Sequence, residues 1–250
     1  MNAYSASQEK NATFILVHGA WHGGWCWRRV ADRLAADGHR VFAPTLTGLG
    51  DRSHLLTPHV NLTTHINDVV NLVLWEELDE IVLCGHSYAG MVITGAAEAL
   101  QSRVRALVYL DAIVPRAGQS VLDCHVEAGA LSTVQLFEAL AADSNGHYLA
   151  PFSAEMLMVG AADRAWVDAR CTTHPYATFK EALPATYAAE RISQKVYVRA
   201  NGFDMPMLRA QTERLKGDPT WKLIELPYGH DLMVDAPAQV ADILRAASND

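Results

Sequence analysis

A serine between small residues is the most reactive feature that the sequence offers. Residues 85–90 read GHSYAG and nearly match the pattern G-x-S-x-G, with an apolar run before them and a run of small residues after them. A serine at a sharp strand-to-helix turn exposes its hydroxyl at a sheet edge, where it can act as a nucleophile. The alternative is that Ser87 only caps a helix. Ala89 replaces the second glycine, so we expect Gly90 to make the closest helix–strand contact.

A nucleophilic serine needs a histidine base, and an acid that orients the histidine. On a strand–turn–helix framework the expected chain order is serine, acid, histidine. His230, in the segment PYGHDLM, follows the last apolar run and precedes the last helix-like segment. That position predicts His230 as the base, against the alternative of an ordinary surface-loop histidine.

Two aspartates are candidates for the acid. Asp111 ends the apolar run RALVYLDA, and Asp204 follows the next apolar run in the segment RANGFDMP. A carboxylate at the end of an apolar strand is costly to bury without a partner, and a catalytic histidine would be one. Asp204 could instead be an ordinary turn residue. We prefer Asp111 and keep Asp204 as the alternative.

The first apolar run ends in the segment LVHGAWHGG, which predicts an oxyanion hole. Such a hole combines the backbone N–H that follows the nucleophile with an N–H from this first loop. The two donors would belong to Tyr88 and Ala20. Gly19 and Trp21 lie beside Ala20 in the chain, and we expect both to contact the substrate.

His18 and His22 stand four residues apart, a spacing that on a helix could hold a metal ion. Gly19, Gly23 and Gly24 make a helix improbable there, and no third ligand is evident. We therefore expect no metal and no cofactor.

Alternating strand-like and helix-like segments predict the framework of these residues. The expected strands are 13–20, 40–46, 80–85, 104–112, 195–200 and 221–227, and the expected helices are 25–40, 62–78, 87–100, 207–217 and 237–248. Continuous apolar strands separated by helices indicate an α/β fold: about six mainly parallel strands with helices on both faces. We expect one domain over residues 1–250, with a core at 12–114 and 190–250. A helical cap without clear strands, at about 115–189, is inserted after the fourth strand.

The predicted cap would cover the carboxyl ends of the strands, where ligands bind in open α/β sheets. It supplies seven large apolar or aromatic residues as candidates for the pocket wall: Phe137, Tyr148, Phe152, Met156, Met158, Trp166 and Tyr176. Each of them could equally pack the cap onto the core. Trp25 and Trp27 are expected to pack on the sheet.

Composition excludes several function classes. Only 19% of residues are charged, the net charge is −8, and no run of Lys or Arg occurs, which argues against nucleic-acid and anionic-membrane partners. The polar start, MNAYSASQEKNA, lacks the features of a signal peptide, and no apolar run reaches about 18 residues. Four separate cysteines without a C-x-x-C pair fit reduced thiols, so we expect a cytoplasmic protein.

The segments FILVHGAWHGGWCW, GHSYAG, LVYLDAIVP and YGHDLM together resemble the α/β-hydrolase superfamily. The similarity is greatest to the branch of plant hydroxynitrile lyases, salicylate-type methylesterases and bacterial carboxylesterases. It implies a carboxylesterase-type serine hydrolase of small, apolar or aromatic esters. Most members of the superfamily carry the acid where Asp204 stands, and some, such as haloalkane dehalogenases, where Asp111 stands. The lyases carry Thr at the position of Gly19 and Lys at that of Asp231, which favours ester hydrolysis here.

Three other functions are compatible with the same residues. They are hydroxynitrile-lyase-like cleavage, cofactor-free oxygenation, and ligand reception with weak hydrolase activity. The expected partner is a small-molecule ester, and the sequence leaves a homodimer open.

Overall fold

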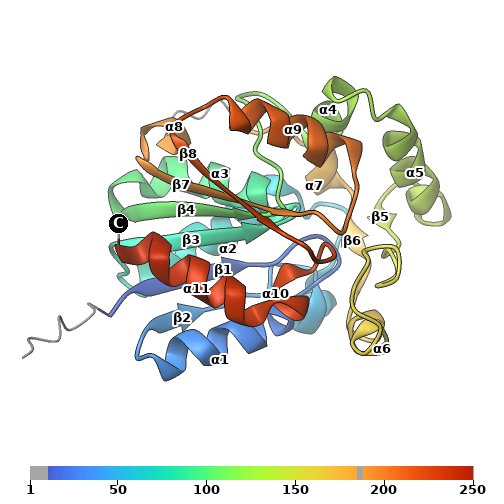
Figure 1. Ribbon diagram of the computed structural model, residues 1–250. Coiled ribbons are helices and arrows are strands. Elements are labelled where there is room, and N and C mark those ends of the chain that lie inside the picture. Colours follow the sequence, from blue (N-terminus) through green and yellow to red (C-terminus); the bar gives the residue numbers. More distant parts are fainter. Residues whose placement is uncertain (1–10, 185–187, 250) are drawn as a thin grey trace, which may run out of the picture.

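The computed structural model describes residues 11–184 and 188–249, so the opening residues 1–10 lie outside it. Six strands form one parallel sheet in the order β2-β1-β3-β4-β7-β8 (Figure 1). Their bounds are Thr13–Val17 (β1), Arg40–Phe42 (β2), Ile81–His86 (β3), Val104–Leu110 (β4), Gln194–Ala200 (β7) and Trp221–Leu226 (β8). The predicted six-stranded α/β architecture is confirmed.

Helices cover both faces of this sheet. One face carries α1 (Arg28–Ala36) and α11 (Pro237–Asn249), and the other carries α2 (Leu62–Trp75) and α3 (Ala89–Leu100) (Figure 1). The central strands β3 and β4 are buried along almost their whole length, which explains why they read as continuous apolar runs. The remaining core helices are α8 (Ala188–Arg191), α9 (Pro206–Lys216) and α10 (Leu232–Asp235).

Several predicted elements are longer than the observed ones, such as the first helix, expected at 25–40 and observed at Arg28–Ala36, and two differences have a clear physical reason. The second strand ends at Phe42 and does not continue to residue 46, because Pro44 lacks the N–H that a longer ladder would use. The cap was expected to have no strand, yet β5 (Tyr148–Leu149) and β6 (His174–Pro175) pair antiparallel within it. Two-residue strands are too short to produce a periodic signal in the sequence.

The cap consists mainly of short helices that lie beyond the carboxyl ends of the strands (Figure 1). They are α4 (Val121–Glu127), α5 (Leu131–Ala141), α6 (Arg164–Asp168) and α7 (Ala177–Lys180). Within the described ranges, no helix has the length and apolar character needed to cross a bilayer.

Candidate active site

Ser87 occupies a strained turn between β3 and α3. Its φ is 54°, in the left-handed region that residues other than glycine rarely adopt. Its N–H donates to the Leu110 carbonyl at 3.2 Å, and its carbonyl accepts the Ile113 N–H at 3.0 Å. Bonds to the last residue of β4 and to the segment after it therefore hold the backbone in a conformation that aims the serine away from the sheet.

There is a steric reason why the second glycine of the motif stands at residue 90, one position later than in the pattern G-x-S-x-G. A Cβ added to Gly90 would lie 1.9 Å from the Ile113 carbonyl oxygen, so no side chain fits there. Ala89 is fully buried, and its methyl group is accommodated. As the sequence predicts, Gly90 makes the close approach, although its neighbour is the segment after β4 and not a strand.

His230 joins Ser87 to Asp111. Its Nε2 lies 2.8 Å from the Ser87 Oγ, and its Nδ1 lies 2.7 Å from the Asp111 Oδ2. Since a carboxylate only accepts, Nδ1 carries the hydrogen and Nε2 is free to accept the serine proton. These three residues follow β3, β4 and β8, and they meet because the carboxyl ends of parallel strands share one sheet edge.

Of the two candidate acids, the structure brings Asp111 and not Asp204 to His230. Asp204 is two-thirds exposed, and its Oδ2 accepts a hydrogen bond from Arg209 at 2.9 Å. Asp111 is fully buried and adopts a φ of 44°, which turns its side chain off the end of β4.

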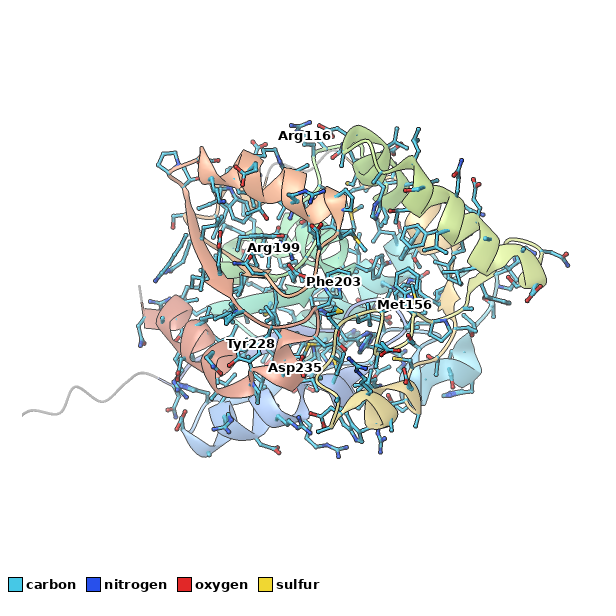
Figure 2. All side chains as sticks on the ribbon, turned by 45° about the vertical axis from the view of Figure 1, so that its right-hand side comes forward. Arg116, Met156, Arg199, Phe203, Tyr228 and Asp235 are labelled. Atoms are coloured by element: carbon cyan, nitrogen blue, oxygen red, sulfur yellow. The ribbon has the colours of Figure 1, made fainter. Side chains whose placement is uncertain are left out.

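A buried arginine that the sequence analysis did not identify compensates the charge of Asp111. Arg199, at the end of β7, donates from Nη1 to Asp111 Oδ1 at 2.6 Å, and the Ala200 N–H donates to the same oxygen at 3.0 Å. The guanidinium also donates to the Phe203 carbonyl at 2.5 Å; Arg199 and Phe203 are both labelled in Figure 2. A buried carboxylate is tolerable when it is paired and fully hydrogen-bonded in this way. The sequence did contain a signal for Arg199, because it is a charged residue inside the apolar run KVYVRA.

Ala20 and Tyr88 line the same cavity as Ser87 and His230. Within the described part of the chain, neither of their backbone N–H groups donates a hydrogen bond, so both are available to an oxyanion. Gly19, expected to contact the substrate, is absent from the cavity wall. A Cβ at Gly19 would lie 2.8 Å from the Ser87 Cβ, so this glycine lets the two loops approach closely.

A second buried pair links the loops of Ala20 and His230. His22 Nε2 lies 3.0 Å from Asp231 Oδ2, and His22 Nδ1 lies 2.8 Å from the Ala20 carbonyl oxygen. Both partners are acceptors, so both ring nitrogens carry hydrogen and the ring is an imidazolium. Burial opposes this charge, but Asp231 outweighs it and raises the pKa of His22 above its ordinary value.

His18 also forms hydrogen bonds within the protein. Both histidines that were considered as a metal-binding pair, His18 and His22, therefore bond to other groups. Its Nδ1 donates to the Gly19 carbonyl at 2.8 Å, and its Nε2 accepts the Leu46 N–H at 3.0 Å. Burial lowers the pKa of His18 to about 3, which keeps the ring neutral.

The wall of the Ser87 cavity is mainly apolar. Of the residues named from the sequence, Trp21, Phe137 and Phe152 line it, and the rings of Trp21 and Phe152 lie 4.6 Å apart. Tyr148, Met156, Met158, Trp166 and Tyr176 are absent from the wall, and both methionines are half exposed. The sequence analysis missed several wall residues: Ile113, Val121, His125, Leu157, Phe179, Met205, Met207 and Leu208.

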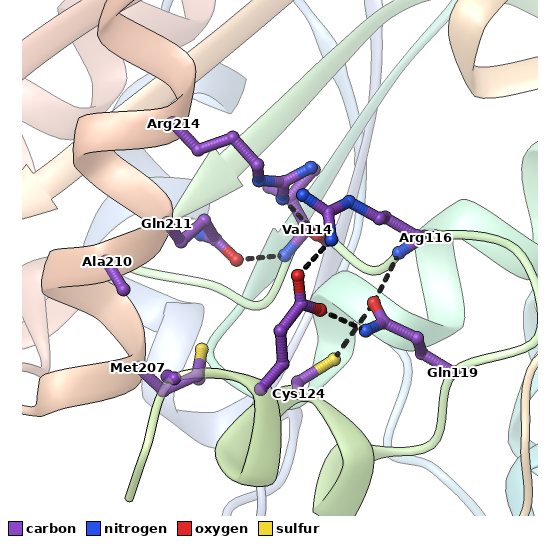
Figure 3. Close-up of a pocket in the computed structure, with 10 residues that line it drawn as sticks. Val114, Arg116, Gln119, Cys124, Met207, Ala210, Gln211 and Arg214 are labelled. Carbon is purple, nitrogen blue, oxygen red and sulfur yellow. Dashed lines mark hydrogen bonds and ion pairs between the residues drawn. The ribbon is translucent and has the colours of Figure 1, made fainter.

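A second cavity of about 190 Å³ lies between α4 and α9, next to the Ser87 cavity of about 40 Å³ (Figure 3). Met207 lines both. Arg116, Gln119 and Arg214 contribute polar groups to the wall of this second cavity.

Comparisons with known proteins identify the family of this chain. The profile of the family described as "Alpha/beta hydrolase family" matches residues 14–243. A carbendazim hydrolyzing esterase from Nocardioides sp. (strain SG-4G) is 42% identical over 239 residues, covering 94% of this chain and 99% of that protein. Methylesterase 1 of Arabidopsis thaliana is 33% identical over 112 residues, 44% of this chain and 43% of that protein.

Solved structures show the same fold. An extracellular alpha/beta-hydrolase from a Paenibacillus species superposes with a TM-score of 0.82 at 23% identity, covering 96% of this chain and all of that chain. Tomato methylketone synthase I superposes with a TM-score of 0.79 at 20% identity, over 96% of this chain and 98% of that one. The profile match and the full-length relative establish that this chain belongs to the α/β-hydrolase family.

Proposed function

We propose that this protein is a serine esterase that hydrolyses small, apolar or aromatic carboxylic esters through an acyl-enzyme. The observation that carries the proposal is the continuous relay from Ser87 Oγ through His230 to Asp111, with distances of 2.8 Å and 2.7 Å. The relatives support ester hydrolysis as the reaction class, since one is named a carbendazim hydrolyzing esterase and others methylesterases.

The geometry supports the following sequence of steps. His230 Nε2 takes the proton of Ser87 as its Oγ attacks the ester carbonyl. The N–H groups of Ala20 and Tyr88 stabilise the oxyanion, and Asp111 stabilises the imidazolium of His230. The imidazolium then protonates the leaving alcohol, and the freed base activates water to release the acid and regenerate Ser87.

The cavity supports apolar substrates that displace wall side chains as they bind. Its volume of about 40 Å³ is small beside the cavity of about 190 Å³ that shares Met207 with it. Met207 is an unbranched, flexible residue between this cavity and the larger one, so its movement would extend the site toward α4.

Hydrolysis of p-nitrophenyl acetate tests the proposal. We expect a burst of p-nitrophenol equal to the enzyme concentration, followed by slower turnover, and no burst in Ser87→Ala. Asp111→Asn should lower turnover by about 10³- to 10⁴-fold, because the wrong tautomer of His230 would face Ser87. Asp204→Asn is the matched control and should leave turnover unchanged.

Four results would contradict this assignment. Binding without a burst would favour a ligand receptor, and full activity of Asp111→Asn with loss in Asp204→Asn would identify the other acid. Cleavage of a cyanohydrin or oxygen-dependent turnover of a heteroaromatic compound, without ester hydrolysis, would favour lyase or oxygenase chemistry.

A further inference from the structure

Two residues that line the Ser87 cavity each carry a buried polar atom without a partner. His125, on α4, is 2% exposed, and its ring meets Phe137 edge-on at 5.3 Å. Its Nδ1 has no hydrogen-bond partner among residues 11–184 and 188–249, and the same is true of the indole Nε1 of Trp21. Both residues line the cavity.

Two buried histidines near Tyr88, His65 and His174, differ from His125 because their ring nitrogens are engaged, whereas the Nδ1 of His86, which is not in the cavity wall, is also unpaired. His65 bonds the Tyr88 hydroxyl at 3.0 Å and the Thr47 carbonyl at 2.9 Å, and His174 Nε2 bonds the Thr178 hydroxyl at 2.7 Å. Buried polar side-chain atoms in native proteins are almost always hydrogen-bonded. Unpaired atoms on two residues that line the same cavity therefore point to a partner that arrives with the ligand.

The chemistry of the two groups defines that partner. Burial lowers the pKa of His125 to about 4, so its imidazole is neutral at pH 7 and offers one donor and one acceptor. The indole offers one donor. Apart from Ser87, Tyr88, His125 and His230, the wall residues that the structure describes are apolar or aromatic, and none of them carries a carboxylate, ammonium or guanidinium group. An uncharged hydroxyl, amide or ring nitrogen fits this environment, whereas a charged group does not.

We propose that His125 and Trp21 recognise an uncharged hydrogen-bonding group on an otherwise apolar substrate, at a distance from the ester carbonyl. This inference rests on the proposed esterase function and narrows its substrate class. A site built to hydrogen-bond a polar group discriminates strongly against an analogue that lacks it, because its own buried groups are then left unpaired.

Two esters of nearly equal size test the proposal: methyl 3-hydroxybenzoate and methyl 3-methylbenzoate. The wild-type enzyme should prefer the hydroxyl compound by at least about tenfold in kcat/KM. His125→Phe replaces the imidazole with an apolar ring and should bring this preference toward one, through a higher KM for the hydroxyl ester. His125→Gln keeps a donor and an acceptor, and should restore part of the preference.

Leu208→Val is the matched control, because Leu208 lines the same cavity without a polar atom. It should change kcat/KM for both esters by the same factor. A preference that survives in His125→Phe, or that is absent from the wild type, would overturn the proposal.

A binding measurement separates this inference from the proposed reaction. Calorimetric titration of Ser87→Ala with both esters needs no turnover, and adding His125→Phe to that variant should weaken binding of the hydroxyl ester alone. Equal weakening of both esters would refute recognition by His125, even if hydrolysis by the wild type is demonstrated. Absence of a burst with selective binding retained would instead refute the esterase step.

Discussion

At the scale of single residues, the site contains two buried ion pairs. Asp111 is paired with Arg199, and Asp231 is paired with His22, so each buried carboxylate has its own cation. Removing one partner of a buried pair leaves an uncompensated charge, which commonly costs about 3–5 kcal/mol. The two pairs therefore hold the loops of the site in a fixed relation to one another.

The pair of His22 and Asp231 gives a prediction at this scale. His22 bonds the carbonyl of Ala20, and the intervening Trp21 has a φ of 64°, so His22→Gln should let this strained turn relax. Because the Ala20 N–H would act only on the oxyanion, kcat should fall about 10- to 100-fold while KM stays nearly constant. Steady-state kinetics, normalised by active-site titration with a fluorophosphonate, measure the effect.

Asp68→Asn is the control for this experiment. Asp68 also anchors a loop, by accepting the Thr47 N–H at 2.7 Å, but it lies outside the site. It should leave kcat per titrated site unchanged. An unaltered kcat per titrated site in His22→Gln would show that the pair contributes to folding alone.

At the scale of elements, the site depends on how closely α3 approaches the segment after β4. Gly90 faces the carbonyl of Ile113, two residues after Asp111, and Ser87 is hydrogen-bonded to the same segment. The nucleophile turn and the acid are thus positioned against each other by one backbone contact.

Separate substitutions of the two small residues at this contact, Gly90 and Ala89, distinguish their roles. Gly90→Ala would place a methyl group 1.9 Å from a backbone oxygen, and should destabilise the protein by about 1–3 kcal/mol and reduce turnover. Ala89→Gly should keep turnover within a few-fold and cost about 0.5–1 kcal/mol, the usual penalty of glycine in a helix. Urea unfolding and esterase assays on both variants measure this; a Gly90→Ala variant of wild-type stability would contradict it.

At the scale of the whole molecule, cap and core are joined at the site itself. The N–H of His230 donates to the carbonyl of Leu157 in the cap at 2.9 Å. A Cβ added to Gly229 would lie 2.0 Å from the carbonyl oxygen of Met158, so the loop of His230 is packed directly under the cap.

Buried neutral histidines make the stability of the whole molecule depend on pH. Burial lowers the pKa of His18 to about 3 and those of His65 and His125 to about 4. Below about pH 6.5 the unfolded chain binds protons that the folded chain refuses, so the free energy of unfolding decreases as the pH falls toward 4. Each histidine contributes up to about 1.4 kcal/mol per pH unit.

His22 affects the free energy of unfolding in the opposite, alkaline direction of pH. Its raised pKa means that its contribution is fully present below about pH 6.5 and is lost as the pH rises through the folded-state value. Stability should therefore be greatest near neutral pH. Urea titrations at pH 5, 6, 7 and 9 measure the free energy of unfolding as a function of pH. His125→Gln should reduce the slope of this curve on the acid side by the amount that corresponds to about one proton. An acid side that is flat between pH 6.5 and 5 would contradict the expectation.

The sequence by itself determined the elements and most of the residues that meet at the proposed site. Continuous apolar strands and their spacing predict the parallel sheet, and a parallel sheet brings the ends of β1, β3, β4 and β8 to one edge. Ser87, His230, Ala20 and Tyr88 could be named on this ground, because each directly follows a recognisable strand.

Only the tertiary structure decided between Asp111 and Asp204, since both follow neighbouring strands of that edge. The decision depends on side-chain direction: a φ of 44° turns Asp111 toward His230, and Arg199 compensates its charge, whereas Asp204 pairs with Arg209 at the surface. The partner of His22 was likewise hidden, because Asp231 lies 209 positions further along the chain and such a distant contact leaves no periodic signal in the sequence. Local patterns specify elements, and packing specifies which polar atoms find one another.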